Sequence, residues 1–252
     1  MEKTGTDKTG SKDKGVVLVI GAGDATGGAI AKRFAREGYF ACVTRRSADK
    51  LQPLVDEITA AGGRARGFAS DARKEEEVEA LVREIEQDIG PIEVLVFNIG
   101  ANVPCSILEE TARKYFKIWE MACLSGFLAG REVARRMVVR ERGTILFTGA
   151  TAGLRGAANF AAFAGAKHAL RALAQSMARE LGPRNIHVAH VVVDGAIDTD
   201  FIKTSFPQMY ARKDQDGILN PEHIAENYWH LHRQPRDAWT FELDLRPWME
   251  KW

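Results

Sequence analysis

The first residues in this chain that are suited to chemistry form a glycine-rich turn. The apolar run Val16–Ile20 ends at Gly21, and Gly27 and Gly28 follow shortly after it. Gly21 permits a tight turn, and Gly27 lets the backbone approach a ligand where a helix starts. Amides at a helix N-terminus bind phosphate well, because they are unpaired and carry a partial positive charge. The turn therefore predicts a binding site for a pyrophosphate.

A pair of arginines, Arg45 and Arg46, follows the second predicted strand, residues 40–44. In dinucleotide-binding proteins an acidic residue at this place bonds the ribose 2′-hydroxyl of NAD. Guanidinium groups suit the 2′-phosphate of NADP instead, since they bind phosphate through paired N–H donors. We therefore expect NADP to be preferred over NAD. The alternative is a pair of solvated surface cations without a ligand.

Short apolar strands alternate with longer amphipathic helices along the chain. Strands are predicted at Val16–Ile20, 40–44, 65–70, 94–98, Gly143–Thr148, 187–193 and about 240–243. Helices are predicted at 29–37, 49–61, 74–88, 111–140, 160–181 and from 221 to about 231, with Asp71 as a candidate cap for the helix at 74–88. This alternation predicts a doubly wound parallel sheet of about seven strands with helices on both faces. The ligand crevice should lie at the carboxyl ends of the strands, where the winding reverses.

Composition and charge limit the classes of function. The chain has 252 residues, 45% of them hydrophobic and 27% charged, with a formal net charge of +1. We expect a disordered tail at 1–14 and a single domain at 15–252. The near-neutral charge gives no reason to expect nucleic acid or an anionic membrane as a partner, and no apolar stretch is long enough to span a bilayer. The three widely spaced cysteines favour a reducing cytoplasm over a disulfide framework, and the histidines are poorly spaced for a metal site.

Over residues 15–245 the chain resembles the short-chain dehydrogenase/reductase family. The resemblance rests on the glycine-rich turn, on Asp71, on Lys167 and on two loop segments, Asn98-Ile99-Gly100-Ala101 and Asp194-Gly195-Ala196-Ile197-Asp198-Thr199. It implies a Rossmann-type α/β fold, a nicotinamide nucleotide cofactor and a substrate lid at about 194–220. In these cofactor segments two positions depart from the family pattern. Ala25 replaces a glycine of the turn, and Asp194 replaces a proline, which predicts a less stiff loop.

The implied cofactor site draws on every one of these segments. Asp71 matches a residue that contacts adenine, Lys167 one that holds the ribose, and Thr199 one that holds the carboxamide. The complete set of expected cofactor-binding residues is Gly21, Gly23, Asp24, Ala25, Thr26, Gly27, Arg45, Arg46, Asp71, Ala72, Asn98, Gly100, Lys167, Gly195, Ile197 and Thr199.

The implied catalytic site is depleted of its usual groups. Family members use a Tyr-x-x-x-Lys pair on a helix, a Ser at a strand end and an Asn on the preceding helix. Here Phe163 stands for the Tyr, Ala150 for the Ser and Cys123 for the Asn, while Lys167 is kept. A positioned general acid contributes about 10²–10⁴ in rate and one oxyanion donor about 10²–10³. Ordinary ketone reduction should therefore be badly impaired.

Other groups near this position can take over the proton chemistry. Thr151 offers a hydroxyl beside Ala150, although a turn hydroxyl usually bonds the local backbone. Cys123 offers a thiol, although a cysteine within a helix is more often a small packed hydrophobe. Lys167 can act itself if burial lowers its pKa. Asn102 and Cys105 are plausible substrate contacts.

The preferred interpretation is an NADP(H)-dependent oxidoreductase that reduces a C=C, C=N or C=O bond of a small organic substrate with a non-standard proton transfer. Two alternatives stay open. One is a catalytically inactive NADP(H)-binding sensor or scaffold, and the other is a non-redox isomerase or lyase on the same fold. The family resemblance also implies a homodimer or homotetramer, formed through the long helices that begin near residues 111 and 160.

Overall fold

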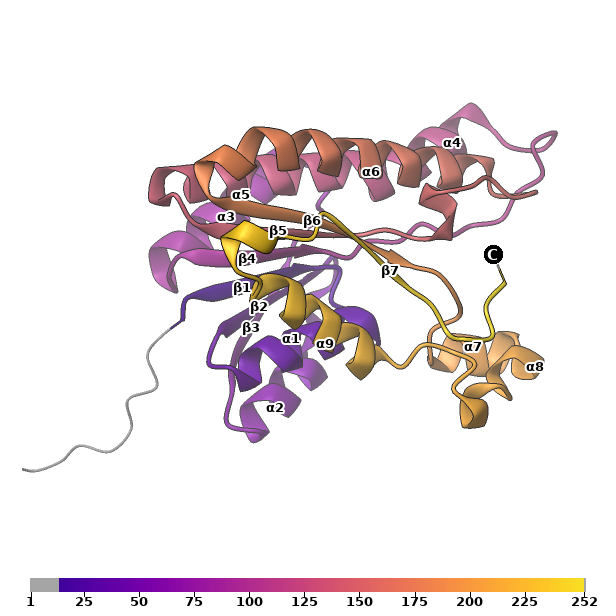
Figure 1. Cartoon of the computed structure of the whole chain (residues 1–252), viewed down its shortest axis with the longest axis horizontal. Coiled ribbons are helices and arrows are strands. Elements are labelled where there is room, and N and C mark those ends of the chain that lie inside the picture. The colour runs from indigo at the N-terminus through magenta and orange to yellow at the C-terminus, as the bar shows by residue number, and fades with distance from the viewer. Residues whose placement is uncertain (1–13, 252) are drawn as a thin grey trace, which may run out of the picture.

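A seven-stranded parallel sheet forms the centre of the protein (Figure 1). The computed structural model describes residues 14–251. The strands are β1 (Val16–Ile20), β2 (Phe40–Arg45), β3 (Arg64–Ala69), β4 (Ile92–Phe97), β5 (Gly143–Thr148), β6 (Ile186–Val193) and β7 (Glu242–Leu245). Their order is β3-β2-β1-β4-β5-β6-β7, and each neighbouring pair is parallel. The winding reverses between β1 and β4, which confirms the predicted doubly wound sheet.

Helices cover both faces of this sheet (Figure 1). One face carries α3 (Glu75–Asp88), α4 (Ala112–Trp119), α5 (Ser125–Arg140) and α6 (Ala161–Leu181). The other carries α1 (Thr26–Arg36), α2 (Gln52–Ala60) and α9 (Pro221–His232). Two short helices, α7 (Asp200–Ser205) and α8 (Pro207–Tyr210), lie near the C-terminal end of the described chain (Figure 1).

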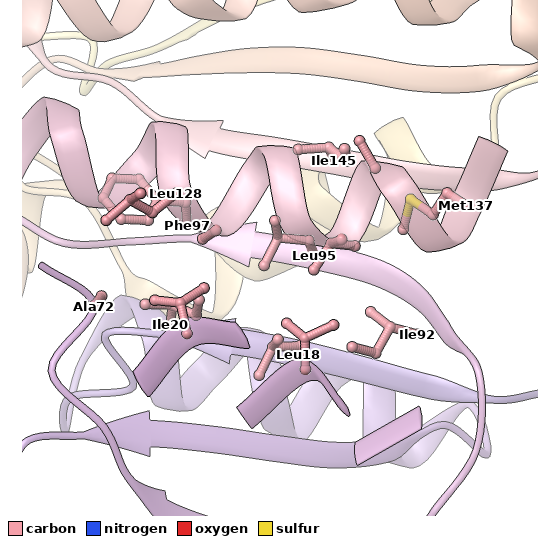
Figure 2. Packing of buried hydrophobic residues seen from close by; sticks show 14 of the residues in the cluster. Leu18, Ile20, Ala72, Ile92, Leu95, Phe97, Leu128, Met137 and Ile145 are labelled. Carbon is pink, nitrogen blue, oxygen red and sulfur yellow. The ribbon is translucent and has the colours of Figure 1, made fainter. Parts of the chain in front are cut away.

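The alternating side chains of β1 explain why the two layers of helices both adhere to the sheet. All five residues of β1 are buried. Leu18 and Ile20 pack on the side of α5, where Leu128 and Met137 also contribute to the core (Figure 2). The intervening valines of β1 belong to the second core, on the side of α1 and α9. A strand that is apolar on both faces is what a central parallel strand requires.

Three local expectations are corrected by the structure. The helix predicted at 111–140 is interrupted by a π-helical turn at Glu120–Leu124, between α4 and α5. The lid segment at about 194–220, for which no helix was predicted, contains α7 and α8. Asp71 does not cap α3, because the N-cap residue is Lys74 and the Asp71 carboxylate accepts hydrogen bonds from Arg73 instead. Such details depend on individual hydrogen bonds, which apolar periodicity does not encode.

The predicted tail lies almost wholly outside the described residues. Of residues 1–14 the structure describes only Lys14, whose Nζ lies 3.9 Å from Glu37 Oε2. Within residues 14–251, the helices are all too short or too polar to cross a membrane.

Candidate active site

Two adjoining cavities run along the carboxyl ends of the strands. The larger has a volume of about 700 Å³ and is bordered by the glycine-rich turn, the loops after β4, β5 and β6, and the start of α6. The smaller, of about 270 Å³, lies over the ends of β2 and β3. Both are bordered by Gly21, Gly23, Asn98 and Gly100, so the two cavities meet at the place where the winding reverses.

The glycine-rich turn has the backbone geometry that only glycine allows. Gly21 has φ +90°, and a Cβ there would lie 2.8 Å from the Asn98 carbonyl oxygen. A Cβ on Gly27 would lie 2.5 Å from the Gly21 carbonyl oxygen. The Asn98 Nδ2 donates to that same oxygen at 3.1 Å. The end of β4 therefore holds the turn in place against the start of α1.

The start of α1 fits a phosphate group. Thr26 is buried, and its hydroxyl has no hydrogen-bond partner among the described residues. A Cβ on Gly23 would meet nothing within 4 Å, so the space in front of the turn is open. Asp24 and Ala25 line the same cavity. An unpartnered hydroxyl beside free helix N-terminal amides is an arrangement that an anion completes.

The smaller cavity brings together the four residues that the sequence assigned to the adenosine end. Arg45, Arg46, Asp71 and Ala72 all line it. Arg45 Nη1 lies 3.4 Å from Asp24 Oδ1, and Arg46 is exposed. The cavity is thus positively charged where a ribose 2′-phosphate would fit.

Sequence reasoning missed a third arginine in this cavity. Arg73 lines it and donates from Nε to Asp71 Oδ1 at 2.8 Å. This contact, with the guanidinium charge, lowers the pKa of Asp71 to about 2. Asp71 is therefore an ionised acceptor at neutral pH. The sequence did offer one signal for Arg73. It lies two residues after Asp71, and two residues so spaced after a strand can share a turn.

Lys167 is a buried residue that lines the larger cavity. Its side chain is 3% exposed, and Nζ donates to the Thr148 carbonyl oxygen at 2.8 Å and to the Ile99 carbonyl oxygen at 3.1 Å. Burial lowers its pKa to about 8. Lys167 thus joins the ends of β4 and β5, and one of its three protons remains for a ligand.

Phe163 and Ala150 line the cavity beside this lysine, as the spacing predicted. The centroid of the Phe163 ring lies 5.9 Å from Lys167 Nζ. The ring belongs to a small apolar cluster with Ala101, Ile118 and other residues of α4 and α6. Neither side chain can donate a proton, so this part of the wall is chemically inert.

Thr151 makes a contact that the sequence did not predict. Its hydroxyl donates to Oδ1 of Asp194 and not to the local backbone, so the expectation of a turn hydrogen bond was wrong. Asp194 is 1% exposed, and its Oδ2 lies 3.3 Å from Arg246 Nη2. Its backbone N–H donates to the Leu245 carbonyl oxygen at 2.8 Å. Asp194 therefore fastens the loop after β6, where a looser loop was expected.

Some predicted site residues do not border the cavities. Cys123 is buried in the π-helical turn, and burial raises the pKa of its thiol. The Thr199 hydroxyl caps α7 by accepting from the Ile202 N–H at 3.1 Å. Cys105 also lies outside the walls, whereas Asn102, Gly195 and Ile197 are part of them. Within residues 14–251, no group of three or more His, Cys, Asp or Glu side chains is arranged to hold a metal ion.

Two further wall residues that the sequence gave no reason to choose come from the C-terminal segment and from the loop after β5. Glu250 and Arg155 border the larger cavity, and Arg155 Nη2 donates to the Lys251 carbonyl oxygen at 3.3 Å. Trp248 Nε1 donates to the Gln215 carbonyl oxygen at 2.9 Å, which ties this segment to the region of α7 and α8. Met209 of α8 completes this side of the cavity.

Comparison with known proteins identifies the class to which this fold and site belong. The profile of the short-chain dehydrogenase family matches residues 15–210, so the chain belongs to that family. It is 30% identical over 187 residues to a 3-oxoacyl-acyl-carrier-protein reductase of Mycobacterium bovis, covering 74% of this chain and 71% of that protein. It is also 30% identical over 206 residues to a 2-dehydro-3-deoxy-D-gluconate 5-dehydrogenase of Formosa agariphila, covering 76% and 78%.

Solved structures share the whole architecture. A short-chain dehydrogenase from Rhodopseudomonas palustris is 50% identical, with a TM-score of 0.79 and coverage of 93% of this chain and 99% of that one. A metagenomic short-chain oxidoreductase in complex with NADP is 26% identical, with a TM-score of 0.81 and coverage of 95% and 100%. The Rossmann-type fold predicted from the sequence is therefore confirmed.

Proposed function

We propose that this protein is an NADP(H)-dependent oxidoreductase that acts on a small organic substrate without a tyrosine proton donor. The observation that carries the proposal is the contrast within one cavity. The turn before α1 and the buried Lys167 keep the geometry of a nucleotide site, while Phe163 and Ala150 leave no hydroxyl where the family places two.

The residues of both cavities can hold the nucleotide. Thr26 and the amides of the glycine-rich turn would bind the pyrophosphate, and the remaining proton of Lys167 would bond the nicotinamide ribose. When bound, the nicotinamide accepts or supplies a hydride. The NADP complex of the metagenomic relative supports this assignment.

A preference for NADP over NAD follows from the charge of the smaller cavity. Arg45 and Arg46 border this cavity. The Asp71 carboxylate also borders it and accepts a hydrogen bond from Arg73. Arg45 ends β2 and Arg46 follows it, so the chain itself is cationic there, and the Asp24 carboxylate lies 3.4 Å from Arg45 Nη1. Guanidinium groups bind phosphate through charge-assisted hydrogen bonds.

Ala150 and Phe163 cannot donate or accept a proton, so the proposed reaction needs another proton donor or acceptor. Hydride transfer to a C=C, C=N or C=O bond remains possible if solvent, the substrate or another side chain handles the proton. The same deficit also favours a second candidate function, a nucleotide-binding sensor or scaffold that does not turn over. A non-redox isomerase or lyase would use the bound nucleotide without net consumption.

The proposal extends to the surroundings of the site. Residues 194–220 would act as a lid, because Met209 and Ile197 border the cavity from this segment. The groove between α5 and α6, bordered by Phe127 and Leu173, would form the interface of a homodimer or homotetramer. With Cys42, Cys105 and Cys123 all unpaired, we place the protein in the cytoplasm.

A substrate panel tests this function. NADPH consumption should be measured with ketones, enones and imines, and NADPH binding by calorimetry in parallel. Binding with consumption of at least one class supports the oxidoreductase. Binding without any consumption favours the sensor, and conversion without net NADPH loss favours the isomerase or lyase.

Restoring the missing hydroxyls tests the reason for the deficit. The double variant Phe163→Tyr/Ala150→Ser should gain ketone reduction by about 10²-fold, the contribution of a positioned acid. Each single variant is the control, and each should gain less. An unchanged ketone rate in the double variant would show that the scaffold is defective in some further respect.

A further inference from the structure

The hydroxyl of Thr151 has a fixed hydrogen-bonding polarity. A threonine hydroxyl has one proton and two lone pairs. That proton is committed to the Asp194 carboxylate. Thr151 and Asp194 both border the larger cavity, next to Ala150. Toward a substrate, Thr151 therefore offers lone pairs, and it binds a donor and not an acceptor.

The negative charge behind this hydroxyl is buried. Asp194 is 1% exposed, and its Oδ2 lies 3.3 Å from Arg246 Nη2. Arg246 also forms an ion pair with Asp244. Replacing either Thr151 or Asp194 would thus alter a preorganised acceptor. Because the pair is held by backbone and side-chain contacts, it does not need to reorganise when a donor arrives.

Two cations of the cavity already donate to backbone carbonyl oxygens, and a carboxylate borders the same cavity. Lys167 donates to two carbonyl oxygens, and Arg155 donates to the Lys251 carbonyl oxygen. Glu250 is half-buried in the cavity wall, and its carboxylate interacts electrostatically with Arg246, which also pairs with Asp194 and Asp244. The aromatic rings of Phe160 and Phe163 form another part of the wall. Carboxylates and aromatic faces both favour a cationic ligand.

We propose that Thr151 and Asp194 form an acceptor subsite for the N–H of a protonated imine, which is reduced to an amine. The proposal rests on the function proposed above and narrows it to one substrate class. A family member with Ser and Tyr offers donors to a carbonyl oxygen, whereas this cavity has lost both donors and presents an acceptor. A ketone oxygen has only lone pairs, so it finds no partner at Thr151.

The chemistry of this substrate explains why no proton donor is needed. The iminium carbon accepts a hydride from the dihydronicotinamide, whose C–H bond breaks and which is thereby oxidised. The π electrons of the C=N bond move to the nitrogen, which loses its positive charge and keeps the hydrogen that it already carried. The product is a neutral amine, and atoms and charge balance without a general acid. The N–H hydrogen bond to Thr151 would hold the carbon in place for this transfer.

Removal of the acceptor tests the proposal most directly. Wild type should reduce 2-methyl-1-pyrroline with a kcat/KM at least tenfold above that for cyclopentanone. Thr151→Val keeps the shape but removes the lone pairs, and it should lower the imine kcat/KM by about 10-fold to 100-fold, as expected when one hydrogen bond to a charged group is lost. Thr151→Ser should restore most of the activity. The matched control is Thr59→Val, which removes an exposed hydroxyl of α2 that bonds only the Val55 carbonyl oxygen.

A binding measurement supplies a readout that is independent of turnover. Pyrrolidine, as its ammonium ion, should bind the complex with NADP⁺ in calorimetry, and Thr151→Val and Asp194→Asn should each weaken it at least tenfold. Affinity for NADPH should stay within about threefold in both variants, which also verifies folding. Asp56→Asn, an exposed carboxylate on α2, is the matched control.

The two proposals fail in different ways. If wild type does not bind NADPH, the proposed function is overturned and this inference falls with it. If NADPH binds but wild type prefers the ketone, or if Thr151→Val leaves imine reduction and pyrrolidine binding unchanged, this inference alone is overturned.

Discussion

At the scale of single residues, the site keeps the lysine of the family pattern but has a phenylalanine in place of the tyrosine acid. Lys167 is buried and bonded to two strand-end carbonyl oxygens, so its position does not depend on a neighbouring tyrosine. Its pKa of about 8 results from burial, and the side chain is thus a mixture of charged and neutral forms near physiological pH. Phe163 fills the place of the phenol with an inert ring. Cofactor binding and proton transfer are separable properties in such a site.

The expected preference for NADPH over NADH depends on Arg45 and Arg46. The variant Arg45→Ala/Arg46→Ala should weaken NADPH binding by about 10-fold to 100-fold, because hydrogen bonds to charged groups contribute roughly 1.5–3 kcal/mol. NADH has no 2′-phosphate, so its affinity should change by less than about threefold. Fluorescence titration with both nucleotides measures this. Arg36→Ala is the control, since Arg36 is exposed on α1 and pairs with Glu222. Equal losses for NADPH and NADH would refute a role in reading the phosphate.

At the scale of elements, three segments approach one another closely at the proposed phosphate site. The turn after β1 lies against the end of β4, and α1 begins directly behind it. The Gly21 carbonyl oxygen accepts a hydrogen bond from Asn98 Nδ2, and it would lie only 2.5 Å from a Cβ on Gly27. The three elements therefore cannot accommodate even one extra methyl group without movement.

Gly27→Ala should disturb both the fold and the nucleotide. Overpacking of this kind costs about 1–3 kcal/mol of unfolding free energy, and NADPH affinity should fall more than tenfold because the turn must shift. Urea denaturation and calorimetry measure the two effects. Gly182→Ala is the matched control, since a Cβ there meets nothing within 4 Å. Unchanged affinity in Gly27→Ala would mean that the turn does not contact the ligand.

The elements also mark the boundary of what the sequence predicts. Apolar periodicity located the central strands well, because burial on both faces leaves a continuous signal such as that of Val16–Ile20. The edge strands β3 and β7 are partly exposed, and their predicted ranges are shifted by one and two residues. It did not reveal the π-helical turn at Glu120–Leu124 or the pairing of Thr151 with Asp194. These features depend on hydrogen bonds between positions that are far apart in the chain or that share no pattern. The wall residue Glu250 was missed for the same reason.

At the scale of the whole molecule, buried histidines link stability to pH. His190 is fully buried and its Nδ1 lies 3.0 Å from Glu242 Oε2, which is also bonded by Arg171. Burial lowers the pKa of His190 to about 4, although Glu242 opposes the shift, and the nearby charges of Lys167 and Arg171 contribute to it. Burial likewise lowers the pKa of His232 to about 4.

Unfolding free energy should therefore fall as the pH drops from about 6.5 to about 4. The unfolded chain binds these protons at the ordinary histidine pKa, so acid favours unfolding, and the contribution is fully present above pH 6.5. Each histidine adds roughly 3 kcal/mol to this loss, at about 1.4 kcal/mol for each unit of pKa difference. In His190→Asn the slope over this range should be less steep in urea denaturation, because one of the buried histidines no longer contributes to it. Identical slopes in the two proteins would contradict the assignment.

We propose that the whole molecule is a nucleotide-binding fold that binds its cofactor without the usual acid, and one titration tests that proposal most directly. Isothermal calorimetry of wild type with NADPH should give saturable heat at one site per chain, with weaker binding of NADH. Phe163→Tyr should leave the NADPH affinity within about threefold, because the ring does not hold the cofactor. Absence of heat with both NADPH and NADP⁺ would contradict the account.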